Sequence, residues 1–206
     1  MNTSDRQGEL LNLYLRNMQE IKWRFRAISD VRNKIMSTTY EQTNIEFCLL
    51  QVRKTLELIA LSSLVSDTDI YKEKLGNIER MWKADLIFKD IGRIHPNFYP
   101  VPINFDPNNK HNWIDYTSPF LTKELFIKAY SKCGKFLHAT SPYLSEKERN
   151  DIYIALWDDI DLWYELIIGL LSNHNINLYN QKALFHIQMG ASDALPTGYI
   201  FHLVEE

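Results

Sequence analysis

Apolar side chains recur at alternating three- and four-residue steps along the first third of the chain, and this spacing constrains the fold more than any other feature. It matches the 3.6-residue turn of an α-helix that packs one face on other helices. The pattern predicts a first helix that ends near Met36 and a second that begins at a capping box, Thr43 with Glu46, and ends near Ser66. The apolar positions are Leu11, Tyr14, Met18, Ile21, Phe25 and Ile28, then Ile45, Leu49, Val52, Leu56 and Ile59.

Similar signals predict three more helices. They are expected at about Thr68 to Ile94, from Ser118-Pro119 to about Ala139, and from the capping box Ser145 and Glu148 to about Leu171. The fold class is therefore mainly α, a helical bundle of about five helices.

Two segments depart from this helical pattern. Residues 95–117 contain four prolines and five aromatic residues, and proline both removes a backbone donor and interrupts helices. This segment is predicted to be a long aromatic and proline-rich loop insertion within a helical-bundle domain, residues 1–182. Residues 183–206 have β-like stretches, Ala183–Met189 and Tyr199–Val204, which predict a small C-terminal β-hairpin appended to the same domain.

Several classes of protein are disfavoured by what the sequence lacks. Its two cysteines, Cys48 and Cys133, lie in apolar helical patterns and form no zinc-binding motif, so no metal site is expected. Phosphate-binding glycine loops, dinucleotide-binding glycine motifs and G-x-S-x-G are missing, and we expect no cofactor. The polar start of the chain and the short length of its most apolar run, Leu166 to Leu171, predict a cytoplasmic protein that does not enter a membrane.

Charge is distributed unevenly along the chain. From residue 140 onward there are three Lys or Arg and ten Asp or Glu, a net charge of −7, which leaves +4 for residues 1–139. This division is compatible with binding nucleic acid on the basic side, or with association between basic and acidic surfaces. It is equally compatible with two ordinary solvated faces.

The second predicted helix carries three charged residues on one face. Glu46, Arg53 and Glu57 are separated by seven and four residues, which places them within about 40° of one another around the helix. An Arg53–Glu57 ion pair explains them simply, because an isolated buried charge is costly. The alternative is that Glu46 and Arg53 line a cleft and contact a substrate or partner.

The fourth predicted helix ends in a group of residues suited to phosphate chemistry. Ser131, Gly134 and His138 share a face, and Lys132 and Lys135 lie beside them. A histidine exchanges protons near neutral pH, and lysines offset phosphate charge. The simpler alternative is that His138 caps the helix or belongs to the core.

An acidic row follows on the fifth predicted helix. Asp158, Asp161 and Glu165 lie on one face, as ligands of a hard cation would. A matching Glu-x-x-His pair is absent from the rest of the sequence, so a solvated acidic face is the favoured interpretation.

The order of these features resembles the HEPN group of helical-bundle proteins. The resemblance rests on Arg53-Lys54 with Glu57, on Phe136-Leu137-His138-Ala139 followed by Ser141-Pro142, and on a long first helix before a capped second one. It implies a protein of a prokaryotic defence or toxin–antitoxin system whose active members are metal-independent ribonucleases with an Arg-x(4–6)-His motif at a dimer interface. No histidine here has such an arginine, and the nearest match is Lys132 followed by five residues and His138.

Together these observations predict a HEPN-like protein that engages RNA or a nucleotide, as a homodimer through its first helix. If it is an enzyme, His138 transfers the proton and Lys132 or Lys135 offsets the phosphate charge, while Arg53, Glu46 and Glu57 line the site. The alternative is a non-catalytic antitoxin or immunity subunit, whose acidic C-terminal third covers a basic protein partner.

Overall fold

The computed structural model describes residues 3–66, 68–76, 83–139, 141–178 and 183–202. Its helices are α1 (Thr3–Arg32), α2 (Glu41–Val65), α3 (Thr68–Leu75), α4 (Ala84–Ile94), α5 (Lys123–Phe136) and α6 (Glu146–Leu171). Its strands are β1 (Val101–Asp106), β2 (Asn109–Asp115), β3 (Asn173–Asn177), β4 (Ala183–Gln188) and β5 (Thr197–His202). The prediction of a mainly α protein is confirmed, with a sheet larger than expected.

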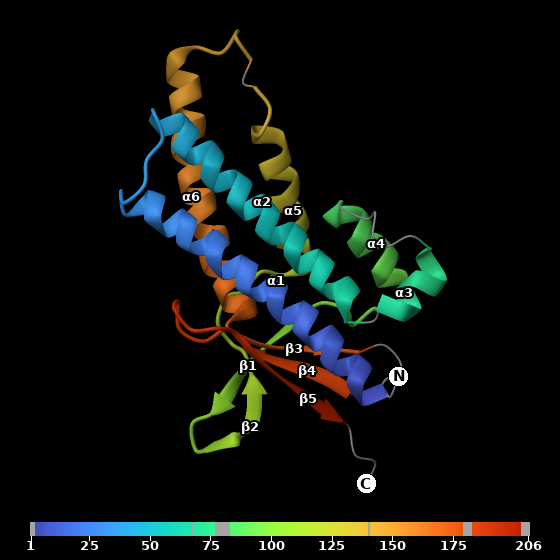
Figure 1. The fold of residues 1–206 in the computed structure, drawn as a ribbon. Coiled ribbons are helices and arrows are strands. Elements are labelled where there is room, and N and C mark those ends of the chain that lie inside the picture. Colours follow the sequence, from blue (N-terminus) through green and yellow to red (C-terminus); the bar gives the residue numbers. More distant parts are fainter. Residues whose placement is uncertain (1–2, 67, 77–82, 140, 179–182, 203–206) are drawn as a thin grey trace.

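The long helices form a bundle above the sheet (Figure 1). Helix α2 packs against α1, α5 and α6, and α3 and α4 lie together at one side. The predicted apolar stripe of α1 is buried at Tyr14, Met18, Ile21 and Ile28. This stripe therefore forms the contact surface of α1, as its spacing indicates.

Two of the predicted helix starts have different outcomes. The capping box of α6 is present, because the Ser145 hydroxyl accepts from the Glu148 backbone and the Glu148 carboxylate accepts from the Ser145 backbone. The capping box predicted for α2 is absent. That helix begins at Glu41 after Tyr40, which provides no side-chain cap, and the Thr43 hydroxyl instead donates to the Tyr40 carbonyl oxygen at 2.8 Å.

The prediction of one continuous helix from Thr68 to Ile94 is also wrong. Two helices, α3 and α4, occupy this range, and residues 77–82 between them lie outside the described residues. Gly76, directly after α3, has φ of +76°, a backbone conformation that side chains rarely adopt. A left-handed glycine at this position ends a helix, so the break follows from the residue type.

A five-stranded antiparallel sheet corrects the prediction for residues 95–117. The strand order is β2-β1-β3-β4-β5, and β1 and β2 come from the segment expected to be an irregular loop. Phe105 pairs with Trp113 across these two strands, and aromatic pairs stabilise such ladders. Pro107 lies in the turn, where Asp106 accepts from the backbone of Asn108 at 2.8 Å. Pro107 therefore lies in the turn that joins β1 to β2, where it does not prevent the two strands from pairing.

The C-terminal strands are confirmed, but they are not a separate hairpin. β4 and β5 pair over their full length, and β4 pairs on its other side with β3, which the sequence did not suggest. The inner face of β3 and β4 is buried at Ile176, Phe185 and Ile187, within the same apolar core as the helices.

Helix α1 covers this inner face closely. A Cβ on Gly198 of β5 would lie 2.7 Å from the Leu11 side chain of α1, so a side chain there has no space. Nearby, the hydroxyl of Tyr14 lies 2.9 Å from Nε2 of His174 on β3, and both residues are fully buried. The sheet is thus fixed to the bundle through α1. Among the described residues, none of the helices has a stretch long and apolar enough to pass through a membrane.

Candidate functional site

Arg53 and Glu57 of α2 meet Tyr130 of α5 in one partly buried polar cluster. An Arg53 Nη atom donates to the Tyr130 hydroxyl at 3.0 Å, and Arg53 Nε lies 3.2 Å from Glu57 Oε1. The Tyr130 hydroxyl in turn donates to Glu57 Oε1 at 3.4 Å. The guanidinium carbon also lies 4.4 Å from the centre of the Tyr130 ring. The predicted Arg53–Glu57 ion pair therefore exists, with a tyrosine as third member.

Gly134 allows the arginine to occupy this position. A Cβ at residue 134 would lie 2.7 Å from Nη1 of Arg53, closer than real side-chain contacts. The small residue lets the guanidinium lie directly on α5. The side chain of Arg53 is only 22% exposed, and Glu57 and Tyr130 engage its Nε and one of its Nη atoms.

The neighbouring ionisable groups of α5 are held in their neutral forms. Burial raises the pKa of the Tyr130 hydroxyl, and the nearby Arg53 opposes this shift. Burial likewise raises the pKa of the Cys133 thiol to about 12. A thiol with such a pKa remains protonated at neutral pH and is not a nucleophile.

Lys132 lies on the other side of α5 and is paired. Its ammonium group forms a salt bridge with Asp159 of α6, in which the lysine side chain is 40% exposed. Asp159 was not among the predicted site residues, although it belongs to the acidic run on α6. The pairing couples α5 to α6 and leaves Lys132 on the solvent side of the contact.

Lys135 and His138 are exposed at the end of α5. The ammonium of Lys135 lies 5.3 Å from the centre of the Phe136 ring, and the helix ends at Phe136 with Leu137 as its cap. His138 follows in a bend and forms no hydrogen bond or ion pair with the described residues. The alternative that His138 caps the helix or fills the core is therefore wrong.

Glu46 is separate from the Arg53 cluster. Its carboxylate accepts a hydrogen bond from the Tyr153 hydroxyl of α6 at 3.1 Å. A second carboxylate of α2, Glu41, accepts from the indole of Trp157 at 2.7 Å. These contacts connect α2 to α6, so Glu46 has a packing partner and does not join Arg53 in one cleft.

The three acidic residues predicted to form a row on α6 have different surroundings. Asp161 forms a salt bridge with Arg32 of α1, whose guanidinium lies 4.4 Å from the Trp157 ring. Asp158 and Glu165 are exposed. Within the part of the chain that the structure describes, no group of three or more His, Cys, Asp or Glu side chains is placed to hold a metal ion.

One surface of α5 nevertheless unites several predicted residues. Lys128, Lys132 and Lys135 lie within about 60° around the helix, and the exposed His138 comes two residues after the helix ends at Phe136. Lys128, which the sequence analysis did not single out, and Lys135 are exposed. We call Lys128, Lys132, Lys135 and His138 the α5 basic stripe. Its signal in the sequence was a lysine four residues before Lys132.

No protein-family model matches the chain, and no curated protein or solved structure is significantly similar to it.

Proposed function

We propose that this protein binds RNA along the α5 basic stripe, as a HEPN-like protein. The observation that carries the proposal is the alignment of three lysines on one solvent-facing surface of α5, ending at the exposed His138. Lysines at such spacing contact successive phosphates. Their ammonium groups bind the phosphate charge and do not distinguish nucleotide sequences. RNA is favoured over duplex DNA because the stripe is short, and the single-stranded loops and ends of RNA offer a few phosphates at a time.

The dimensions of the stripe support contact with a few phosphates. From Lys128 to Lys135 the helix rises by about 10 Å, which covers roughly two or three nucleotides of a single strand. Asp159 holds Lys132 in place without removing it from solvent. Arg53 serves the site indirectly, because its contacts with Tyr130 and Glu57 fix α2 against α5.

The position of His138 also favours RNA cleavage as a second activity. The imidazole beside a bound strand accepts the proton of a ribose 2′-hydroxyl, whose oxygen then attacks the adjacent phosphorus. A 2′,3′-cyclic phosphate forms, and the 5′ oxygen of the next nucleotide leaves and takes a proton from water. Lys135 offsets the charge that develops on the phosphate oxygens. This chemistry requires the 2′-hydroxyl, so DNA of the same sequence would bind without being cut.

Binding is tested by the dependence of affinity on salt. With three lysine contacts on single-stranded RNA, the logarithm of the association constant should fall against log salt concentration with a slope of about −2. Lys135→Ala should reduce that slope by about 0.7, whereas Lys89→Ala on exposed α4 should leave it unchanged. Equal effects of the two substitutions, or no binding at low salt, would refute the α5 basic stripe as an RNA site.

Cleavage is tested separately, with RNA and EDTA, for the wild type and His138→Ala. Loss of cutting with retained binding is the expected result for the variant, because His138 contributes little to phosphate affinity when neutral. Binding without cleavage in the wild type would establish a non-catalytic RNA-binding protein. Absence of both from the folded protein would favour the non-catalytic subunit that covers a protein partner.

A further inference from the structure

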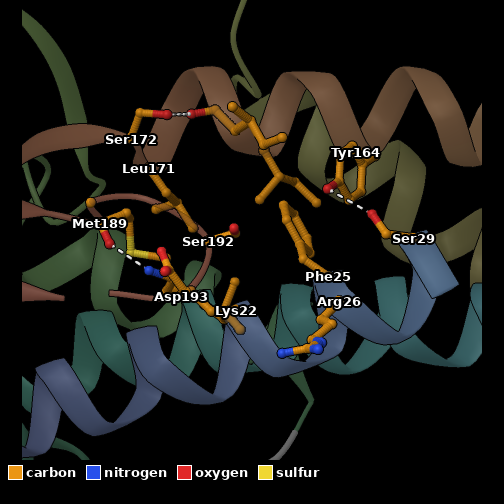
Figure 2. Close-up of a pocket in the computed structure, with 14 residues that line it drawn as sticks. Lys22, Phe25, Arg26, Ser29, Tyr164, Leu171, Ser172, Met189, Ser192 and Asp193 are labelled. Atoms are coloured by element: carbon orange, nitrogen blue, oxygen red, sulfur yellow. Dashed lines mark hydrogen bonds between the residues drawn. The ribbon is translucent and has the colours of Figure 1, made fainter. Parts of the chain in front are cut away.

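A cavity of about 710 Å³ lies between α1, α6 and the loop after β4, away from α5. Its walls come from the middle of α1, the C-terminal half of α6 and the loop that follows β4 (Figure 2). None of its lining residues belongs to α5, so this cavity is distinct from the α5 basic stripe. Its volume is within the range of sites that bind small organic molecules, about 300–1,000 Å³.

The cavity walls are predominantly apolar. Phe25 comes from α1 and Leu171 from α6 (Figure 2), and the lining also includes Ile21, Ile167 and Ile168. One end is closed by the ring of Tyr164, which stacks on Phe25 with 4.5 Å between ring centres. The Tyr164 hydroxyl is 3.3 Å from the Ser29 hydroxyl, so the aromatic wall has a fixed orientation. A ligand there would gain its binding energy mainly by burying hydrocarbon.

Three charged residues line the cavity, and two of them are already engaged. The Lys22 ammonium donates to the backbone carbonyl oxygens of Met189, Ala191 and Ala194, which uses all three of its hydrogens. Asp193 interacts electrostatically with this same lysine. Lys22 therefore fixes the loop that forms one wall, and the charges of Lys22 and Asp193 largely offset each other.

Arg26 is the remaining charged residue of the lining. It lies one turn after Lys22 on α1, it is exposed, and its guanidinium forms no hydrogen bond or ion pair with the described residues. A guanidinium offers a planar set of donors that matches a carboxylate in a bidentate arrangement. The cavity thus combines an apolar chamber with one available cation at its margin.

We propose that this cavity binds an amphipathic carboxylate, with its hydrocarbon part between α1 and α6 and its carboxylate on Arg26. A neutral molecule of the same size would fill the chamber but leave Arg26 without a partner. A cationic one would place its charge beside the guanidinium. The proposal does not depend on RNA binding, because the two sites share no residue.

The experiment measures binding of decanoate, decanol and decyltrimethylammonium to the full chain by isothermal titration calorimetry. Decanoate should bind at least tenfold more tightly than decanol, and the cation most weakly. Arg26→Ala should weaken decanoate about tenfold and leave decanol unchanged. Arg149→Ala, at an exposed arginine of α6 outside the cavity, is the matched control and should change neither.

A second variant tests the chamber itself. Ile168→Trp places a larger side chain in the cavity from the partly exposed face of α6, and it should abolish binding of both decanoate and decanol while circular dichroism shows an unchanged helix content. The proposal is overturned if decanol binds as tightly as decanoate, if Arg149→Ala and Arg26→Ala have the same effect, or if Ile168→Trp binds as the wild type does.

Discussion

Acidification should destabilise the protein through one buried histidine, His174 at the start of β3. Nε2 of its ring lies 2.9 Å from the Tyr14 hydroxyl, and Nδ1 lies 2.8 Å from the Leu171 carbonyl oxygen. The carbonyl can only accept, so Nδ1 carries the hydrogen and Nε2 accepts from Tyr14. Burial lowers the pKa of His174 from 6.5 to about 4, and burial raises that of Tyr14, which keeps its hydroxyl as the donor.

The sign and size of the effect follow from proton linkage. In the unfolded chain His174 takes up a proton below pH 6.5, whereas in the folded protein it remains neutral until about pH 4. The free energy of unfolding therefore falls as the pH decreases through this interval, and the contribution of His174 is complete above 6.5. The loss should be about 2 kcal/mol by about pH 5 and about 3 kcal/mol in total.

Urea unfolding, followed by tryptophan fluorescence between about pH 7.5 and pH 5, measures this change. Burial also lowers the pKa values of His95 and His186, so the wild-type slope contains their contributions too. Comparison with His174→Gln isolates the effect of His174, because glutamine does not titrate and can still donate to Leu171 and accept from Tyr14. The stability difference between the two proteins should shrink by about 2 kcal/mol on acidification. A difference that is constant with pH would refute the assignment of a neutral His174.

Three further substitutions test other parts of the structure. Tyr130→Phe removes the hydroxyl between Arg53 and Glu57 and should lower the free energy of unfolding by about 1 kcal/mol in urea titrations. Ser145→Ala removes the capping box of α6 and should cost a similar amount, about 1 kcal/mol, with lower helix content by circular dichroism if the first turn unwinds. We also propose homodimerisation through α1, because Trp23 is 61% exposed beside an apolar groove shared with α2. Trp23→Glu should then sediment as a monomer while the wild type sediments as a dimer, and a monomeric wild type would end this proposal.

The stripe of α1 and the start of α6 were predictable from local sequence. The stripe of α1 and the capping box of α6 depend on residues within one or two turns, so neighbouring sequence determines them. The start of α2 was not predictable in this way. Thr43 and Glu46 have the spacing of a capping box, but the structure uses Glu46 to accept from Tyr153, 107 residues away in the chain. A contact between distant helices replaced the local one.

The sheet exceeded the prediction because its strands are brief and distant in sequence. β3 alternates buried His174 and Ile176 with three asparagines, which are poor strand formers. β1 begins close to two prolines, and it pairs with β3 only at Val101 and Pro102. Neither β1 nor β3 could be predicted as a strand from its own sequence. Their pairing becomes favourable once α1 and the end of α6 bury His174 and Phe185 against Tyr14.

In the candidate sites, too, positions within one helix were predictable from the sequence, whereas contacts between helices were not. Lys132 and Lys135 could be placed on one face of α5 from their spacing, since helical periodicity alone determines it, whereas His138 lies beyond the end of the helix. Tyr130 and Asp159 could not be assigned as the partners of Arg53 and Lys132, because each pair joins different helices. The cavity beside Arg26 was least accessible to sequence reasoning. Its walls come from α1, α6 and the loop after β4, and only the tertiary packing of these distant segments creates an apolar space with one arginine at its margin.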